Sequence, residues 1–339
     1  MNHITSRVRF AISVIIFALI GTSGLLLNDY VLYVMTLAVI FAILSLGLAV
    51  LLGYTGYLSL AQGAFFGVGA YSSAILTTKT EWSFWIALPA STLLAAIVGF
   101  VVGLIVFRTR GLYFAIVTLG VGLVSYGLFV SARGITGGTG GFVGVPGVGP
   151  LFGLTFETPL NLLLLAMALL WITFQAATLF VSSSIGSDCQ AVREDLMLAE
   201  SLGINAARAR MAAFVFASAA AGLAGSFFAA FTHFIAPETF GVLTTGFQIV
   251  VMVVVGGMGT LWGPMIAAAV LVGIPEVLRA VNRFSLLAYG VVLLCVVLFA
   301  PRGISGLVSE AFRRTKRTVQ PLAKRKFSNS IPEQGGEEP

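Results

Sequence analysis

The chain has 339 residues, of which 58% are hydrophobic and only 9% are charged, and its formal net charge is +6. Soluble domains carry about 25% charged residues, so this composition, with a mean hydropathy of +1.02, excludes a water-soluble fold. The basic residues accompany no zinc finger or aromatic RNA-binding module, so nucleic acid is the weaker explanation of the positive charge.

Apolar stretches long enough to cross a bilayer follow one another along most of the chain. A helical crossing needs about 20 apolar residues, and no charged residue occurs between Asp29 and Lys79. The sequence therefore predicts an all-α, polytopic integral membrane protein, a helical bundle of about ten spans within a range of eight to ten. The expected spans are 10–27, 30–52, 56–78, 84–107, 111–132, 159–181, 211–235, 241–258, 261–278 and 284–300.

The first apolar stretch has two interpretations. Arg7 and Arg9 precede it, as in a secretory signal peptide. However, the stretch runs on to Leu27, beyond the 7–15 residues usual for such a signal, and no A-x-A cleavage pattern follows. We therefore favour a retained first helix.

The third, eighth and ninth spans are interrupted by Gly or Pro, in GYTGYLSLAQG, in GGMGTLWGP and at Pro275. Each can be a broken or re-entrant half-helix, which membranes tolerate where the backbone lines a cavity. Polar side chains at these interruptions are candidates for the translocation pathway, because polar groups in hydrocarbon need partners or water. The alternative is that they bond between packed helices. The candidates are Tyr54, Tyr57, Ser59, Gln62 and Gln248.

A glycine-rich segment separates the fifth and sixth spans. Its run ITGGTGG at 135–141 lacks the Lys-Ser/Thr pair of a phosphate-binding loop, so it predicts no ATP hydrolysis by this chain. We expect a flexible outer loop. Its length leaves a mobile gate or a contact for an external partner as the alternative.

Basic residues indicate the orientation. With the N-terminus in the cytoplasm, 15 of the 19 Lys and Arg residues fall on the inner side and four on the outer side. The positive-inside rule thus favours cytoplasmic N- and C-termini. The basic tail, with RRTKR and KRK, also suits anionic lipid headgroups, and its acidic end is expected to be disordered.

A polar island interrupts the apolar pattern at 188–210, where seven of the 32 charged residues gather. Ser187 and Gln190 have the spacing of a capping box, and Gly203 is a natural helix stop. The sequence therefore predicts one helix over about 188–202 in a cytoplasmic loop.

That helix is expected to be amphipathic. Val192, Leu196 and Ala199 share one face, and Leu198 and Leu202 extend it. Such a helix either lies on the membrane surface or docks a soluble subunit, and its residues alone favour neither alternative.

Catalytic and metal-binding signatures do not occur. The sequence has no G-x-S-x-G elbow and no H-E-x-x-H pair. Cys189 and Cys295 fall in different parts of the expected topology, and His3 and His233 are far apart, so we predict inert thiols, no metal and no cofactor. The chain is not expected to be an enzyme.

Motifs in the same order resemble those of branched-chain amino acid ABC importer permeases, most closely the LivM type. The polar island and the span that follows it carry AVRED at 191–195, AESLGIN at 199–205, AAF at 212–214 and AGLAG at 221–225. The other matching stretches are GYTGYLSLAQGAFFGVGAY at 53–71, RGLYFAIVTLG at 110–120, VVGGMGTLWGPMIAAAVLV at 254–272 and PRGISGL at 301–307.

The resemblance implies a permease domain over 1–307, with a cytoplasmic coupling loop at 182–210 and a tail at 308–339. It also implies a second, LivH-type permease, two ATP-binding subunits of LivG and LivF type, and a periplasmic amino-acid-binding protein. The sequence departs from the small residues frequent in such loops at Met197 and Leu198. The residues implied to dock the ATPase are Arg193, Glu194, Ala199, Glu200, Ser201, Leu202 and Gly203.

The function implied by the resemblance is import of branched-chain or related neutral amino acids across the inner membrane, by alternating access driven by separate ATPases. The leading alternative is an ion-coupled secondary transporter of a small polar solute. Proton-coupled transporters usually place acidic or His residues near the midplane, whereas His233, Glu238 and Glu276 lie toward the predicted span ends. A membrane scaffold without transport activity is a further alternative.

Overall fold

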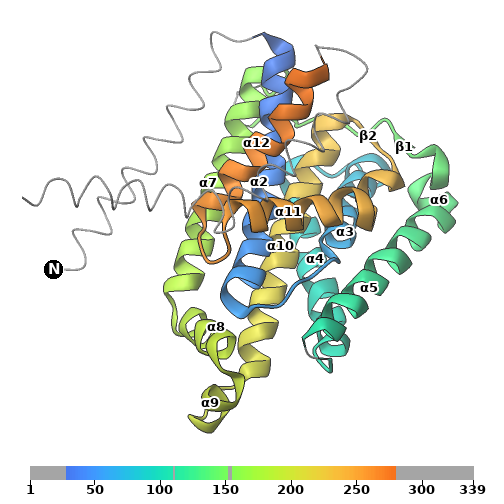
Figure 1. The fold of residues 1–339 in the computed structure, drawn as a ribbon. Helices are drawn as coiled ribbons and strands as arrows, with labels where there is room; N and C mark the ends of the chain where they lie inside the picture. Colours follow the sequence, from blue (N-terminus) through green and yellow to red (C-terminus); the bar gives the residue numbers. More distant parts are fainter. Residues whose placement is uncertain (1–27, 110, 152–154, 280–339) are drawn as a thin grey trace, which may run out of the picture.

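The computed structural model describes residues 28–109, 111–151 and 155–279, and most of them form α-helices (Figure 1). The strands found in these residues are two of two residues each. The expected spans 10–27 and 284–300, Cys295 and the tail at 308–339 lie outside the described residues.

Within the described residues, five helices are long and apolar enough to cross a bilayer, which confirms a polytopic membrane protein. Their ends follow local signals. Gly56, with φ 76°, ends the first of them, and Thr158 caps the fourth, whose first residue is Pro159. The five helices are α2 (Asp29–Thr55), α4 (Phe84–Val106), α5 (Leu112–Ser131), α7 (Pro159–Ser182) and α10 (Ala206–Thr232).

The centre of the bundle is formed by α2 and α10, and the shorter helix α3 (Gln62–Lys79) packs closely against α10. Two glycines permit this approach: a Cβ on Gly225 would overlap the Phe66 carbonyl, and one on Gly69 would overlap that of Gly222. The Ser226 hydroxyl also donates to Ser73 Oγ, at 2.9 Å. Small residues thus let two membrane helices approach backbone to backbone.

The interruptions expected at GYTGYLSLAQG and GGMGTLWGP are present, but the one expected at Pro275 is not, because a helix runs unbroken through that residue. Residues 56–61 between α2 and α3 are not helical, so helix begins at Gln62, six residues later than the expected start of the third span. After α10 come η3 (Pro237–Phe240), the π-helical turn η4 (Val242–Gly246), α11 (Phe247–Gly256) and α12 (Trp262–Arg279). Figure 1 shows α11 lying across the direction of α2, so the eighth expected span is a half-helix.

The expectation of a flexible outer loop after α5 is wrong for most of that segment, because it is tied to the bundle. It forms α6 (Arg133–Thr136), η2 (Gly138–Gly140) and β1 (Phe142–Val143), and β1 pairs antiparallel with β2 (Phe234–Ile235) just beyond α10. The Trp85 indole Nε1 donates to the Gly149 carbonyl at 3.0 Å. The pairing of β1 with β2 cannot be predicted from the glycine-rich composition of this segment.

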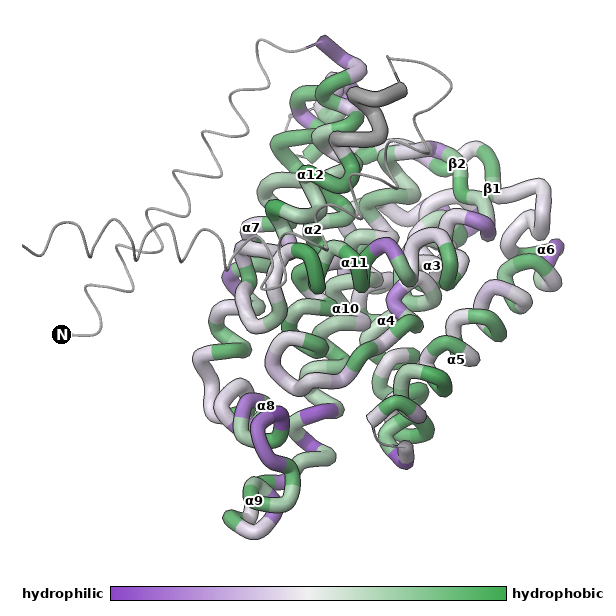
Figure 2. Tube along the Cα trace, viewed as in Figure 1, coloured by the Kyte–Doolittle hydropathy of each residue, from purple (hydrophilic) through white to green (hydrophobic). Residues whose placement is uncertain are grey.

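The surface divides by hydropathy (Figure 2). Hydrophilic residues gather on α8 (Ser184–Glu194) and at helix ends, whereas α4 and α5 expose apolar side chains along their length. Such outward apolar faces suit lipid or another membrane subunit. Exposed examples are Leu93, Ile97, Leu104, Ile116, Leu123 and Val124.

Candidate docking and translocation site

Between α7 and α10 the chain forms two short helices where one was expected. α8 ends at Glu194, Asp195 is extended with φ −151° and ψ 110°, and α9 runs over Leu196–Ser201. The Asp195 carboxylate accepts the Leu198 N–H at 3.0 Å, which is an N-cap. The prediction of one helix over 188–202 is therefore wrong, because Asp195 starts a new helix.

The start of α8 also differs from the expectation. Ser183 caps it and accepts the Gly186 N–H at 3.3 Å, so the expected capping box at Ser187 and Gln190 is not used. The predicted stop at Gly203 is confirmed, since α9 has ended by Leu202 and Gly203 adopts φ 83°. An added Cβ there would meet nothing within 4 Å, so backbone conformation alone favours glycine.

The inner side of the α8–α9 pair is apolar and small. Val192, Ala199 and Ala206 form a buried cluster, against which Leu196 and Ile204 pack. Ala199 is 3% exposed. Its side chain therefore packs α9 against the start of α10, and its contact with a docked subunit stays a prediction.

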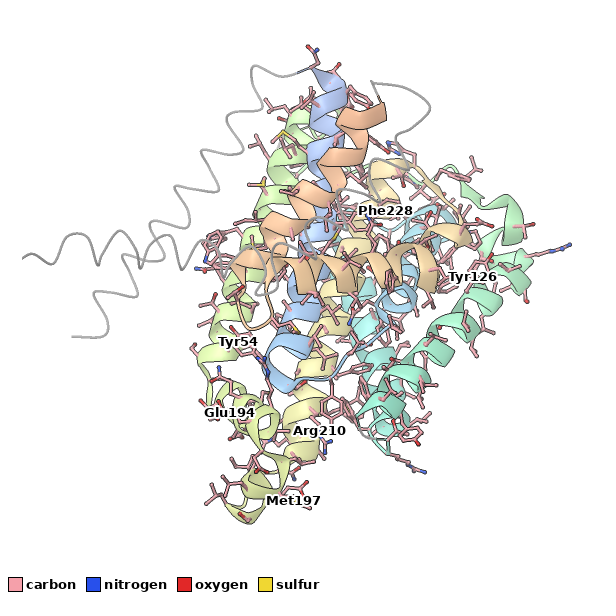
Figure 3. The ribbon with its side chains drawn as sticks, viewed as in Figure 1. Tyr54, Tyr126, Glu194, Met197, Arg210 and Phe228 are labelled. Carbon is pink, nitrogen blue, oxygen red and sulfur yellow. The ribbon has the colours of Figure 1, made fainter. Side chains whose placement is uncertain are left out.

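The outer side of α9 carries large apolar side chains into solvent. Met197 is 83% exposed and Leu202 is 73% exposed, and Leu198 is exposed beside them. Figure 3 places Met197 at the tip of α9, at the far end from the bundle. The expectation that Leu198 and Leu202 extend the inner face is wrong. Exposed apolar groups gathered in this way mark an interaction surface. Glu194, Glu200, Ser201 and Gly203 are exposed on the same pair of helices.

Arg193 extends from α8 toward the bundle. Its guanidinium Nη1 donates to the Gly53 carbonyl in the last turn of α2. Its side chain also lies 3.4 Å from the Cβ position of Gly56 and 3.3 Å from that of Gly259, in the turn before α12. Arg193 was expected to dock a partner, but the structure has it bonded to α2.

The break between α2 and α3 is held by side chains. The Leu60 N–H donates to Thr118 Oγ1 of α5 at 3.1 Å, and the Ala61 N–H to Ser59 Oγ at 3.3 Å. The ring of Tyr57 packs edge-on against Phe114, with ring centroids 4.9 Å apart. Side chains thus replace the helical hydrogen bonds that residues 56–61 lack.

A buried arginine completes this region. Arg210, in the first turns of α10, is 4% exposed; its Nε donates to the Ala206 carbonyl at 3.0 Å and its Nη1 to the Tyr57 hydroxyl. Its guanidinium carbon lies 5.2 Å from the centre of the Tyr57 ring and 5.9 Å from that of Phe107. Sequence reasoning counted Arg210 only as a basic residue of the inner side. Its position at the edge of an apolar span was the available signal.

Of the pathway candidates, Ser59 and Gln62 are fully buried, and both polar atoms of the Gln62 amide lack a hydrogen-bond partner among the described residues. They lie where η3 and η4 approach: a Cβ on Gly63 would be 2.6 Å from the Phe240 carbonyl, and one on Gly246 3.0 Å from that of Leu60. A buried amide without partners is costly in hydrocarbon, so Gln62 is the candidate with most physical support. Tyr54 is buried at the end of α2, and Gln248 is half-buried on α11.

Residues 30–300 match the family model described as branched-chain amino acid transport system / permease component. The chain belongs to this permease family. The permease is 34% identical over 292 residues to the high-affinity branched-chain amino acid transport system permease protein LivM of Escherichia coli strain K12, covering 79% of this chain and 68% of that protein. It is equally similar to LivM of Salmonella typhimurium strain LT2.

The permease also resembles a second kind of relative. It is 35% identical over 147 residues to the permease protein LivH of Escherichia coli strain K12, covering 41% of this chain and 47% of that one. No solved structure matches the chain. The family confirms the resemblance read from the motifs, and it confirms that the chain is a transport component and not an enzyme.

The permease has a buried thiol beside the docking helices. Cys189 is fully buried on α8, and its Sγ donates to the Ala209 carbonyl of α10 at 3.3 Å. Burial, with a smaller contribution from Asp188, raises the pKa of the thiol to about 11. Its contact is thus between helices, and the thiol stays protonated at physiological pH.

Proposed function

We propose that the permease is the LivM-type subunit of an ABC importer that carries branched-chain or related neutral amino acids across the inner membrane. The family match over 30–300 and the identity to LivM proteins over most of the chain support this assignment. The single structural observation that carries the proposal is the exposed apolar surface on α9. Exposed apolar side chains of this kind are typical of a surface that binds another protein.

The proposed importer contains more than this chain. Its members are a second permease of LivH type, two ATP-binding subunits of LivG and LivF type, and a periplasmic amino-acid-binding protein. Support for two permeases comes from the relatives, since LivM and LivH are both named as permease proteins of a high-affinity branched-chain system and both resemble this chain.

The proposal includes a topology, which rests on the distribution of basic residues. We infer about ten spans, with both termini and the α8–α9 pair in the cytoplasm, from the 15 basic residues on that side against four on the other. Residues 1–307 would then form the membrane domain and 308–339 a cytoplasmic tail. The α2–α3 break and the turn after α11 lie on the same side as α8, as their contacts with Arg193 require.

Docking is assigned to the outer surface of α9. Met197, Leu198 and Leu202 would insert between ATPase side chains, with Glu194 and Glu200 at the rim. Burying one such apolar side chain contributes about 1.5–3 kcal/mol. The surface is rigid, because Asp195 caps α9 at its start and the buried Ala199 fixes its inner side. A rigid element can transmit a movement of the ATPases to the bundle.

The pathway is assigned to the start of α3, where Ser59 and Gln62 lie beside η3 and η4. Alternating access would separate these elements in turn, and the Gln62 amide would then meet water or the polar groups of the amino acid. The polar side chains of Tyr54, Tyr57 and Gln248 are secondary candidates on the neighbouring elements.

The test is co-purification of the tagged permease in mild detergent, with bound subunits identified by mass spectrometry. Two variants, Glu200→Lys and Leu202→Asp, are expected to lose the ATP-binding subunits while keeping the second permease. Glu157→Lys, the same charge reversal on the opposite side of the bundle, is the control and should keep all subunits.

Two results would contradict the proposal. Unchanged recovery of the ATP-binding subunits with both variants would show that α9 is not the docking surface. A wild-type chain that purifies alone, and takes up solute only with an ion gradient, would identify a secondary transporter instead.

A further inference from the structure

Two arginines from the region of the docking helices bond to the same short stretch of the chain, one to a backbone carbonyl and one to a side-chain hydroxyl. Arg193, just before α9 in sequence, bonds to the Gly53 carbonyl on one side of Gly56. Arg210, just after α9, bonds to the Tyr57 hydroxyl on the other side. The end of α2 and the start of the non-helical segment are therefore both attached to the chain that flanks α9.

The first contact lies at a junction of three elements. The last carbonyls of a helix have no partner within the helix and carry partial negative charge, which favours a guanidinium. Gly53 also approaches the turn before α12, where a Cβ on Gly53 would be 2.8 Å from the Gly259 nitrogen. Arg193 lies beside that turn as well, so one side chain contacts α8, α2 and the α11–α12 connection.

The second contact is buried. Arg210 points from α10 into the cluster made by Tyr57 and Phe107, and Figure 3 places it on α10 between α8 and the rest of the bundle. A buried guanidinium needs hydrogen-bond partners, and within the described residues the Tyr57 hydroxyl is the side chain that provides one. Movement of the start of α10 must therefore move Tyr57 or break this bond.

The segment between these contacts and α3 is the non-helical link between two helices. Residues 56–61 lie outside both helices, although the Gly56 N–H still bonds to the Leu52 carbonyl and the Ala61 carbonyl accepts from Phe65. Ala61 adjoins Gln62, the buried amide of the candidate pathway. Two attachment points fix both the position and the direction of a segment, whereas one would let it rotate. The arginines are placed to move the start of α3 when the docking helices move.

We propose that Arg193 and Arg210 are positioning residues that convert displacement of α9 into displacement of the segment 56–61 and so of Gln62. This rests on the proposed function, in which an ATPase docks on α9. Their role in this proposal is exerted through α2 and Tyr57, whatever further contact the exposed side of Arg193 makes with the ATPase. They set how much solute moves for each ATP hydrolysed.

The test measures coupling in the complete importer, reconstituted in proteoliposomes with its binding protein. Uptake of radiolabelled leucine and hydrolysis of ATP are recorded in the same vesicles for Arg193→Ala and Tyr57→Phe. We expect the ATP-binding subunits to remain bound and hydrolysis to continue. Uptake per ATP should fall by about tenfold, the change in an equilibrium for the loss of one hydrogen bond to a charged group.

Two control variants remove an arginine and a tyrosine hydroxyl from exposed positions outside the proposed contacts. Arg208→Ala takes a charge from the exposed side of α10, and Tyr113→Phe takes a hydroxyl from an exposed tyrosine of α5; both should keep the wild-type ratio. A cycle of Tyr57→Phe, Arg210→Lys and the double variant tests whether the pair acts as a unit. The double variant should lose no more than the larger single loss.

The outcomes separate the two proposals. If Tyr57→Phe and Arg193→Ala keep the wild-type uptake per ATP, the positioning role is overturned while docking on α9 stands. If they lose the ATP-binding subunits, the arginines are docking residues and the positioning role is again overturned. If wild-type uptake needs no ATPase, the proposed function itself fails, and with it this inference.

Discussion

The two central helices and two peripheral ones have similar apolar sequences and very different surroundings. Protein covers 78% of the most apolar window in both α2 and α10, but only 28% of that in α4 and 22% of that in α5. The sequences differ in side-chain size: α10 carries AAAGLAGSFFAA where it meets α3, whereas α4 and α5 turn Leu, Ile and Val outward. Small residues thus mark the close contact of α10 with α3, whereas α2 buries Leu, Ile and Val, so large aliphatic side chains mark an outward face only on α4 and α5.

The largest effect is expected where two backbones touch. In Gly225→Leu the side chain would overlap the Phe66 carbonyl, so the change should cost more than the roughly 1–3 kcal/mol of ordinary overpacking. The amount of folded permease in the membrane, measured by immunoblot and by melting in detergent, should fall to near zero. Gly120→Leu on α5 is the control, since a Cβ there meets nothing within 4 Å. Equal loss in both variants would contradict the view that α10 packs closely against α3 while this face of α5 is open.

A lysine on the outward face of α5 tests whether lipid or another subunit covers that face. Val124, near the middle of α5, is exposed, and a lysine at a helix centre costs about 2.5–3.5 kcal/mol on insertion. Val124→Lys should lower the amount of permease in the membrane severalfold, by immunoblot, without changing the composition of the purified complex. Loss of the second permease from that complex would show that α5 faces a subunit and not lipid.

A smaller effect is expected at the hydrogen bond between Ser226 and Ser73, which joins α10 to α3. Interhelical bonds in membrane proteins contribute about 0.6 kcal/mol on average. Ser226→Ala, Ser73→Ala and the double variant should each lower the unfolding free energy in detergent by a similar small amount. Additive losses would mean that the two hydroxyls act separately.

The smallest effect concerns Cys189, where the buried environment of α10 continues onto α8. Because burial raises the pKa of the thiol to about 11, the reactive thiolate should be scarce at pH 8 and increase only as the pH approaches 11. N-ethylmaleimide should therefore leave Cys189 unmodified in the folded permease at pH 8, by mass spectrometry, and modify it after denaturation. Rapid labelling of the folded protein would show that α8 leaves α10.

Most of the long helices could be predicted from the sequence, because apolar length is a property of composition. The expected span 84–107 corresponds to Phe84–Val106, and 159–181 to Pro159–Ser182. The interruptions were also indicated by their glycines. The late start of α3 was not, since Tyr57 and Leu58 suit an apolar helix as well as a buried loop.

The docking region shows why the site was harder to predict from the sequence than the long helices were. Asp195 could be an exposed residue within a helix or a cap between two helices, and only the backbone distinguishes them. Arg193 bonds to a carbonyl 140 residues away, which no local pattern can reveal. All the implied docking residues keep that role as a prediction, although Ala199 is buried and the exposed Arg193 also bonds to α2.

The crosswise helix α11 bears on how the chain is made. With the turn η4 it covers Val242–Gly256, fewer than the about 20 residues that a helical crossing needs, so a nascent chain ending at Gly256 would offer the insertion machinery no complete span after α10. We expect α11 and α12 to enter the bilayer together as a hairpin closed at 257–261, after α10 is already in place to receive them. This part of the permease would then insert as a pair after α10, with the short helix held in the membrane by its neighbours.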